Sequence, residues 1–414
     1  MKRKNFWAFF LFILSFFIFL SRHSWPQLIL GQYEDEAPVG TWNTLGITNA
    51  SSISLGNTRF AFATDCSASL SNPALLSNLP KITFSLISSF NSASFFKYSL
   101  VNTGVIYTDK NIFLNSYAID FAGVSVRVKN WAFSLSQALA EIYDRPSTEQ
   151  NYSYRGSLYY TLNFNQEGEL KVVNFSISRK ISNRISFGIG LNYIYGNLRK
   201  KIQEKWINTN ITITDDKSFE FQGYYLNGGL WVGLSDKFSI AAIFRTPYSK
   251  KAESQSLHRY QSPSGNTDIK IEASSQNTYK QPLVIGLGMS YQFSPKLRVA
   301  SDFSFFNWSK YKVIYFEEEL DRNFKDIVKI GAGIEYLSAL KIFNQEVEIP
   351  FRAGMIYDPQ PMREPSSSYL LFSFGAGIHW GKFLLDIGAF VGKERGSGDS
   401  LSAQKVILSL SFLM

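Results

Sequence analysis

From about residue 80 to the end of the chain, hydrophobic and polar residues alternate with a period of two. The segment 283–293 shows this alternation clearly. One side of it would carry Leu283, Ile285, Leu287, Met289, Tyr291 and Phe293. The other side would carry Val284, Gly286, Gly288, Ser290 and Gln292. Because successive side chains of a strand point to opposite faces, the pattern predicts β-strands with one apolar face and one polar or small face.

About fourteen strands are predicted in this way. They lie at 81–96, 114–128, 131–141, 170–180, 185–196, 219–234, 237–246, 279–293, 297–309, 326–337, 347–357, 369–380, 382–392 and 404–413. Most of them are about 10–13 residues long. Roughly 9–11 tilted residues cross a bilayer, whereas strands of soluble proteins centre on about 5–6. The lengths therefore favour a barrel whose apolar face meets lipid over a soluble sandwich whose apolar face meets a second sheet.

The connections between the predicted strands alternate between short and long, with 338–346 as the one turn that is longer than expected. Short turns fall at Lys129-Asn130, Ser182-Asn183, Ser235-Asp236, Ser294-Pro295-Lys296 and Gly381. Long and mostly polar connections fall at 97–113, 142–169, 197–218, 247–278, 310–325, 358–368 and 393–403. Short periplasmic turns and long outer loops are typical of outer-membrane barrels. Lipid offers no hydrogen bonds to an open sheet edge, so the sheet must close. The predicted fold class is therefore all-β: a membrane-spanning antiparallel β-barrel of about 14 strands.

Several predicted strands have a second face that is very small. Glycines two positions apart, and hence on one face, occur as Gly188 and Gly190, Gly286 and Gly288, Gly331 and Gly333, and Gly375 and Gly377. In a barrel this face lines the lumen.

The N-terminus has the pattern of a secretory signal peptide. Lys2, Arg3 and Lys4 precede an apolar run over 6–20, which is shorter than the ~20 residues that a membrane-spanning helix needs. An uncleaved membrane anchor is the alternative. We divide the chain into a signal peptide at 1–27, an N-terminal hatch or plug at 28–80 and a barrel at 81–414. The cleavage site lies somewhere between Ser21 and Gly31. The part of the hatch at 40–80 has no strand pattern, so a flexible leader is the alternative to a packed plug.

Composition and charge narrow the function classes. Charged residues make up 18 % of the chain, below the roughly 25 % of ordinary soluble domains, and aromatic residues make up 16 %. The net charge of +9 comes from scattered residues without a basic stripe, so nucleic-acid binding is not expected. One cysteine, Cys66, excludes a disulfide within the chain and a cysteine metal cluster. No metal site, cofactor or catalytic residue is predicted; the faint pair of Ser373 and His379 would have to come within hydrogen-bond reach to act as nucleophile and base.

An ordered set of short motifs resembles the FadL family of outer-membrane transporters, which includes hydrocarbon-uptake proteins related to TodX. The motifs are Asn49-Ala50-Ser51-Ser52-Ile53-Ser54-Leu55-Gly56-Asn57-Thr58, Ala63-Thr64-Asp65-Cys66-Ser67-Ala68, Ser71-Asn72-Pro73-Ala74-Leu75, Phe244-Arg245-Thr246-Pro247, 282–291, Ala300-Ser301-Asp302-Phe303, Asn307-Trp308-Ser309 and 351–358. The resemblance covers roughly 40–414. It implies a fourteen-stranded barrel with the N-terminal segment folded inside, where Asn72, Pro73 and Ala74 form a hatch motif. It also implies passive movement of hydrophobic ligands to the periplasm, hatch rearrangement and a kinked strand that opens sideways.

Four charged residues are expected to face the lumen. Strand parity places Arg245, Asp302, Arg352 and Asp386 on the inner side, since an arginine facing lipid at mid-depth would cost about 2–4 kcal/mol. Either arginine could meet the carboxylate of a ligand, which suits the guanidinium fork. An Arg–Asp network that holds the hatch to the wall is the alternative that we favour.

The predicted function is passive uptake of hydrophobic molecules, such as long-chain fatty acids or similar lipidic or aromatic compounds, across a Gram-negative outer membrane. The expected partners are a fatty-acid-like ligand and outer-membrane lipid, and we expect a monomer that is not an enzyme. One alternative is a non-transporting barrel that serves as a docking platform for secretion or surface proteins. A general porin is the other alternative.

Overall fold

The computed structural model describes residues 47–94, 105–108, 113–154, 156–262, 267–315, 318–342, 345–364, 366–396 and 402–414. The signal peptide expected at 1–27 and residues 28–46 of the expected hatch lie outside these residues.

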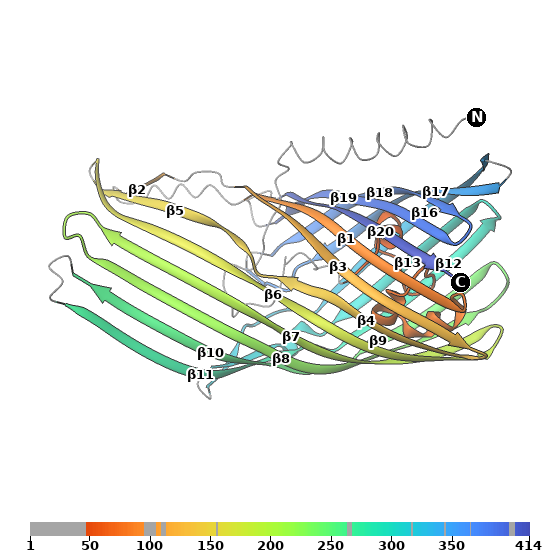
Figure 1. Ribbon diagram of the computed structural model, residues 1–414, viewed down its shortest axis with the longest axis horizontal. Coiled ribbons are helices and arrows are strands. Elements are labelled where there is room, and N and C mark those ends of the chain that lie inside the picture. The colour runs from red at the N-terminus through yellow and green to blue at the C-terminus, as the bar shows by residue number, and fades with distance from the viewer. Residues whose placement is uncertain are drawn as a thin grey trace.

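Fourteen strands of the described chain form a closed antiparallel barrel (Figure 1). In order around the ring they are β1 (Ile82–Ser94), β3 (Phe113–Val128), β4 (Trp131–Ile142), β6 (Ser157–Ser182), β7 (Ile185–Trp206), β8 (Thr212–Gly233), β9 (Phe238–Arg245), β12 (Val284–Ser294), β13 (Leu297–Phe306), β16 (Ile327–Ile342), β17 (Gln345–Pro359), β18 (Ser368–Trp380), β19 (Phe383–Arg395) and β20 (Ser402–Leu413). Strand β20 pairs with β1 from Thr83 opposite Leu413 to Asn91 opposite Lys405, which closes the ring. The predicted fold class and strand number are confirmed.

The alternation along the strands separates an apolar outer face from a small and polar inner face. On β12, Ile285, Leu287 and Met289 point outward and are 45 %, 59 % and 43 % exposed, whereas Gly286 and Gly288 point inward. The same outward band continues around the barrel with Phe84, Leu135, Leu191, Phe351 and Phe374. An apolar band of this kind is stable when it meets hydrocarbon instead of water.

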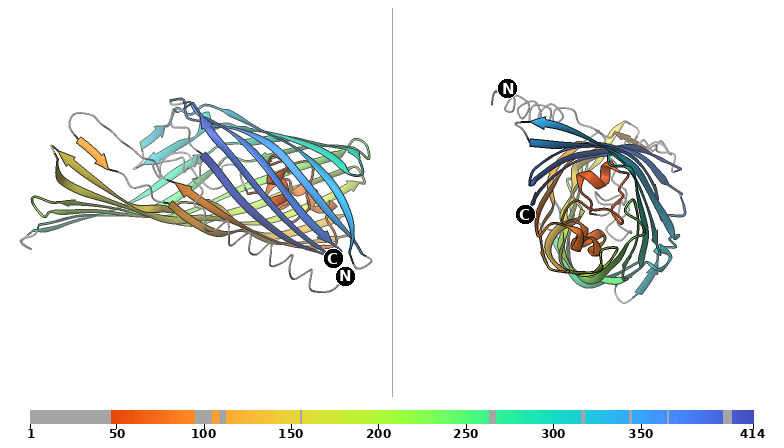
Figure 2. Two further views of the ribbon diagram at one scale, coloured as in Figure 1. Left: turned by 90° about the horizontal axis from the view of Figure 1, so that it is seen from above. Right: turned by 90° about the vertical axis from the view of Figure 1, so that its right-hand side faces the viewer.

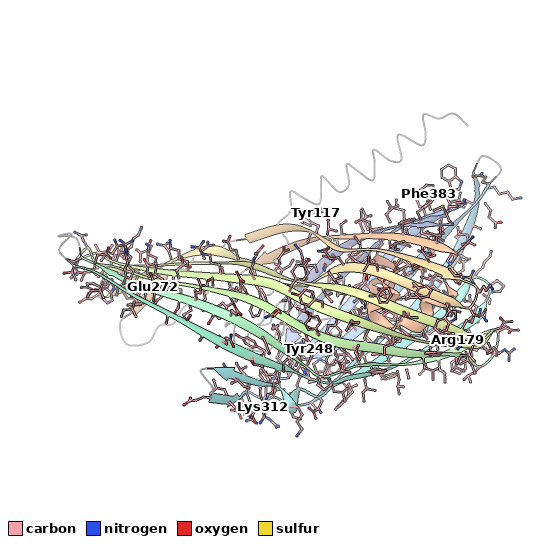
Figure 3. The ribbon with its side chains drawn as sticks, turned by 60° about the horizontal axis from the view of Figure 1, so that its bottom comes forward. Tyr117, Arg179, Tyr248, Glu272, Lys312 and Phe383 are labelled. Carbon is pink, nitrogen blue, oxygen red and sulfur yellow. The ribbon has the colours of Figure 1, made fainter. Side chains whose placement is uncertain are left out.

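Seven strands of the described chain build a sheet that extends beyond one end of the barrel. Strands β6, β7 and β8 continue past the rim, and β10 (Tyr248–Gln261) and β11 (Asp268–Gln281) add to β8. Strands β5 (Arg145–Tyr154) and β2 (Val105–Thr108) add on the other side. Figure 1 shows the overhang to the left of the barrel, and Figure 3 places Glu272 near its far end and Phe383 and Arg179 at the opposite end of the molecule.

The prediction of polar loops at 142–169, 197–218 and 247–278 is therefore wrong, because much of each range is strand. These segments lie outside the apolar band. Their strands therefore do not require the continuous apolar face by which a strand in lipid is recognised. The single strand predicted at 279–293 is also wrong: β11 ends at Gln281 and β12 begins at Val284. Pro282 lies in the break, where its missing N–H removes a ladder hydrogen bond. The connection at 310–325 holds a further hairpin, β14 (Lys312–Tyr315) and β15 (Glu318–Asp321), after the short helix η2 (Trp308–Lys310).

Residues 47–80, which we call the hatch, fold inside the barrel. They contain the helices α2 (Ala50–Ser54), α3 (Ala68–Ser71) and η1 (Pro73–Asn78). Figure 2 shows these red and orange turns enclosed by the strands, toward the end of the barrel where the C-terminus lies. None of the helices in the described part of the chain is long and apolar enough to span a bilayer.

Candidate functional site

The hatch lies directly against glycines of the barrel wall. A Cβ atom at Gly354 would stand 2.1 Å from the backbone nitrogen of Gly56, and one at Gly331 would stand 2.0 Å from the Gly56 carbonyl oxygen. A Cβ atom at Gly333 would lie 2.4 Å from the carbonyl carbon of Leu55. Gly56 itself has φ +71°, where glycine carries no steric penalty. The small inner face read from the sequence is thus the surface on which the backbone of the hatch packs.

Hydrogen bonds hold the hatch to the wall at its first bend. The Asp302 carboxylate on β13 accepts hydrogen bonds from the backbone N–H groups of Arg59 at 2.6 Å and Phe60 at 3.0 Å. The Asp302 side chain is buried, so these two donors would lose their partners if the carboxylate were removed. Ser409 and Ser373 accept from the backbone N–H groups of Ala50 and Gly56 at 2.8 and 3.1 Å.

The Asn72-Pro73-Ala74 motif forms a second bend of the hatch. Asn72 donates to the carbonyl oxygen of Phe60 at 2.7 Å, and its side-chain oxygen accepts from the backbone N–H of Ala74 at 3.1 Å, which caps η1. On the wall, the Ser178 hydroxyl donates to the carbonyl oxygen of Ala74 at 3.0 Å. A Cβ atom at Gly188 would approach Pro73 to 2.5 Å.

Arg352 and Asp386 belong to a buried network of charges on the inner wall. Arg352 lies directly opposite Glu335 across β16 and β17, and its Nε donates to the Glu335 carboxylate at 2.7 Å. Its Nη1 donates to Asp386 on β19 at 2.5 Å. Arg298 holds the other oxygen of Glu335 at 3.1 Å, and the Nε2 atom of His379 is 3.2 Å from Asp386. Two guanidinium groups and two carboxylates therefore compensate one another within the wall.

Arg245, the last residue of β9, lies in different surroundings. Among the described residues its guanidinium makes no hydrogen bond or ion pair, and its Nε atom is buried. The guanidinium carbon lies 5.9 Å from the ring centres of both Tyr225 and Tyr248. The positive charge is therefore held by aromatic faces and by no carboxylate. The sequence expectation treated Arg245 and Arg352 alike, and the structure separates them.

Arg245 lines a cavity between the hatch and the end of the barrel that carries the overhanging sheet. Its volume is about 190 Å³. The hatch forms its floor with Ile47, Phe60, Leu70 and Ser71. Its walls and roof carry Ile194, Tyr225, Ile243, Tyr248, Gln281, Val284, Phe306, Trp308, Ile327, Gln360 and Pro361, among others. The lining is mostly aromatic and aliphatic, and it also carries the charged residues Arg59, Glu141, Arg245 and Lys329. Apolar walls with a small number of polar groups are typical of a small-molecule site.

Sequence reasoning missed several residues of this cavity. Gln281 was placed inside a strand, and Gln360 in a polar connection, so neither was considered as a lumen residue. Tyr225 could have been assigned from parity, since it precedes Asn227 and Gly229 on the inner face of β8. Tyr248 could not, because it falls in the range 247–278 that was predicted to be a polar connection. Gln360 offers no such signal because it follows the end of β17.

A groove lies on the outer wall beside a bulge in β3. The pairing of β1 with β3 shifts between Ile87 and Ser88, which leaves Asp120 as an extra residue. Asp120 is buried and binds Lys405 at 2.8 Å. The groove has a volume of about 630 Å³ and is lined by residues that include Phe84, Leu86, Gly123, Leu135, Leu410 and Phe412.

Within the described chain, Ser373 and His379 do not form a nucleophile–base pair. Ser373 bonds to the hatch backbone, whereas His379 contacts Asp386. The two lie six residues apart on one strand, which separates them by roughly 20 Å at ~3.3 Å per residue. Among the described residues, no group of three or more His, Cys, Asp or Glu side chains is arranged to hold a metal ion.

The closed ring, the outward apolar band and the enclosed N-terminal segment define a β-barrel of the outer-membrane type. The sequence model of the BamG family matches residues 43–405, and the chain belongs to the BamG family. No protein with a curated description matches the chain.

Several solved structures share the fold of this chain. A Pseudomonas aeruginosa FadL homologue superimposes with a TM-score of 0.63 at 13 % identity, covering 88 % of this chain and 98 % of its own. The Pseudomonas putida toluene transporter TodX gives 0.62 at 14 % identity, covering 89 % and 98 %. The Ralstonia pickettii toluene transporter TbuX gives 0.58 at 14 % identity, covering 89 % and 98 %. At these identities the likeness shows the fold, so the resemblance to the FadL family read from the sequence is supported at the level of architecture.

Proposed function

We propose that this protein is a channel for passive passage of hydrophobic molecules across the outer membrane. The observation that carries the proposal is the cavity of about 190 Å³, which has apolar and aromatic walls and a floor made by the hatch. A ligand that enters from the outer end would rest on Ile47, Phe60 and Leu70. The ligand could move further only if the hatch rearranges, because the hatch backbone lies directly against the glycines of the barrel wall and leaves no space between them.

The exit of the proposed route lies sideways, through the outer groove next to Gly123. Its apolar lining would pass a hydrophobic molecule into the membrane without exposing it to water. The bulge at Asp120 weakens the ladder between β1 and β3 at this point, since a bulge leaves one residue unpaired. The mature protein would act as a monomer in the outer membrane, without the signal peptide proposed at 1–27 and without catalysis.

Ligand binding to the purified protein in detergent tests the proposal. Trp308 lines the cavity, so its fluorescence should change saturably on titration with toluene. The Trp308→Phe variant should lose that signal while remaining folded. In planar bilayers the hatched barrel should give no steady ionic conductance, unlike a general porin. Failure of fatty acids, alkanes and aromatic compounds alike to bind would refute a transport function.

A docking function is a second candidate, and the sheet that overhangs the barrel favours it. The inner face of this sheet carries Leu162, Ile202, Ile213, Tyr260, Ile269 and Ile271, and Ile269 and Ile271 are 51 % and 59 % exposed. A photo-crosslinking residue at position 271 should then give one discrete protein adduct in cells. The same residue at Ser274, on the opposite face, should not. Equal or absent adducts at both positions would count against docking.

A further inference from the structure

Arg245 brings a positive charge into the cavity, and no carboxylate of the described chain forms an ion pair with it. Glu141 also lines the cavity, but its carboxylate accepts a hydrogen bond from Tyr143 and lies 3.7 Å from the Nζ atom of Lys250. The other two cations that line the cavity have acidic neighbours. Lys329 binds Asp358 at 2.7 Å, and the backbone N–H of Arg59 bonds to Asp302. Arg245 has only the faces of Tyr225 and Tyr248 within the described chain. A charge withdrawn from water is costly unless it is paired, so this guanidinium would gain from an anion in the cavity.

Two buried amides with unused hydrogen-bonding atoms line the same cavity. The Nε2 atom of Gln281 and the Oε1 atom of Gln360 are buried without a hydrogen-bond partner among the described residues. The two side chains belong to residues that are 6 % and 1 % exposed. The Nε2 atom of Gln281 is therefore a second hydrogen-bond donor in the cavity, in addition to the guanidinium of Arg245. The oxygen of Gln360 is an acceptor that a water molecule or a hydroxyl group can satisfy.

The size and walls of the cavity limit what can carry the anion. A cavity of about 150 Å³ with apolar walls accommodates benzene, and sites for drug-sized ligands start near 300 Å³. The volume of about 190 Å³ therefore suits one ring with a short side chain. Phe60, Phe306 and Trp308 offer aromatic surface to such a ring.

We infer that the cavity selects compact aromatic carboxylates, with the ring against Phe60, Phe306 and Trp308 and the carboxylate on Arg245 and Gln281. The inference deepens the proposed transport function and rests on it. A carboxylate matches the guanidinium fork and accepts the free donor of Gln281 as well. A plain hydrocarbon would leave the charge of Arg245 unpaired, and a long acyl chain would exceed the volume.

The test compares four probes on the full-length protein in detergent by isothermal titration calorimetry. The probes are 3-phenylpropanoate, its neutral analogue 3-phenylpropan-1-ol, toluene and palmitate. The acid should bind at least about tenfold more tightly than the alcohol, because hydrogen bonds to a charged group are stronger than those between neutral groups. Arg245→Met should remove that preference, so that the acid and the alcohol bind equally. Arg245→Lys should restore part of it.

Arg179→Met is the matched control, because Arg179 also lies over an aromatic ring, Trp131 at 4.9 Å, but on the outer wall. It should leave all four affinities unchanged. The inference would be overturned if the acid and the alcohol bound with equal affinity, or if Arg245→Met bound the acid as tightly as the wild type does. If toluene still bound in that case, the proposed transport function would stand. Palmitate binding as tight as that of the acid would overturn the size argument. Absence of binding by every probe would refute both the inference and the proposed function.

Discussion

Gly354 on β17 and Gly56 in the hatch approach so closely that a Cβ atom at Gly354 would stand 2.1 Å from the Gly56 nitrogen. The three atoms nearest to that Cβ belong to the backbone of Leu55 and Gly56, so the hatch cannot make room by a change of side-chain rotamer. We predict that Gly354→Val displaces the hatch at a cost of about 1–3 kcal/mol, the usual range for overpacking. Planar-bilayer recordings should show ionic conductance that the wild type lacks. Ala353→Val, which adds bulk to the outward side of the same strand, should remain closed. A closed Gly354→Val channel would show that the hatch does not seal the lumen.

Cys66 reports on hatch opening because it is 0 % exposed in the closed structure. Its backbone N–H donates to Ser85 at 3.1 Å, and its Sγ atom is 3.0 Å from the carbonyl oxygen of Thr83. Cys66 belongs to the hatch and not to a membrane-spanning strand, and burial raises the pKa of its thiol to about 11. We predict that a maleimide at pH 7.5 labels the native protein slowly and the heated, SDS-treated protein quickly, since the thiolate is the reactive form. Asp236→Cys in a Cys66→Ser background is the control for an accessible thiol, because the Asp236 side chain is 94 % exposed. Equal labelling rates for the two thiols would contradict a packed hatch.

The rate of Cys66 labelling can also test whether Asp302 holds the hatch to the barrel wall. Asp302→Ala leaves the N–H groups of Arg59 and Phe60 without their acceptor, and each buried unsatisfied group costs about 1–3 kcal/mol. We predict that Cys66 labelling becomes about tenfold faster or more, because 1.4 kcal/mol already changes an opening equilibrium tenfold. Asp302→Asn retains one acceptor oxygen and should give a smaller increase. Unchanged labelling in Asp302→Ala would mean that the hatch is held elsewhere.

The barrel could be read from the sequence because lipid imposes a strict pattern on it. Every residue of 283–293 must choose between hydrocarbon and lumen, so the period of two is unbroken there. The overhanging sheet escaped prediction for the converse reason. Strand β7 continues through Arg199-Lys200-Lys201-Ile202-Gln203-Glu204-Lys205 without a lipid-facing side.

The candidate site could be predicted only in part, because partners depend on register. Strand parity alone placed Arg245 and Arg352 inward. The contrast between them arises from Glu335, which pairs with Arg352 through the alignment of β16 with β17. No local pattern around Arg245 indicates that it lacks such a neighbour.

The two arginines should accordingly respond in opposite ways to the same substitution. Arg352→Met leaves Glu335 and Asp386 without their shared partner, and breaking a buried ion pair costs about 3–5 kcal/mol. Arg245→Met removes a charge that has no carboxylate partner in the described chain, so stability should stay the same or rise. Urea unfolding in lipid vesicles, followed by tryptophan fluorescence, measures both. Equal destabilisation by the two variants would contradict the difference between their surroundings.

The lateral exit can be separated from ligand binding by a substitution at Gly123. A Cβ atom there would meet Phe121 at 2.7 Å and the Cβ atom of Ser136 at 2.8 Å, at the edge of the outer groove. We predict that Gly123→Val narrows the groove and lowers uptake of a radiolabelled ligand by whole cells severalfold. Binding to the purified variant should be unchanged, since the cavity around Arg245 does not include Gly123. Ala353→Val serves again as the control, because it adds bulk to a strand of the barrel away from the groove. Normal uptake by a folded Gly123→Val protein would place the exit elsewhere, and parallel loss of uptake and binding would indicate that the substitution acts on the cavity.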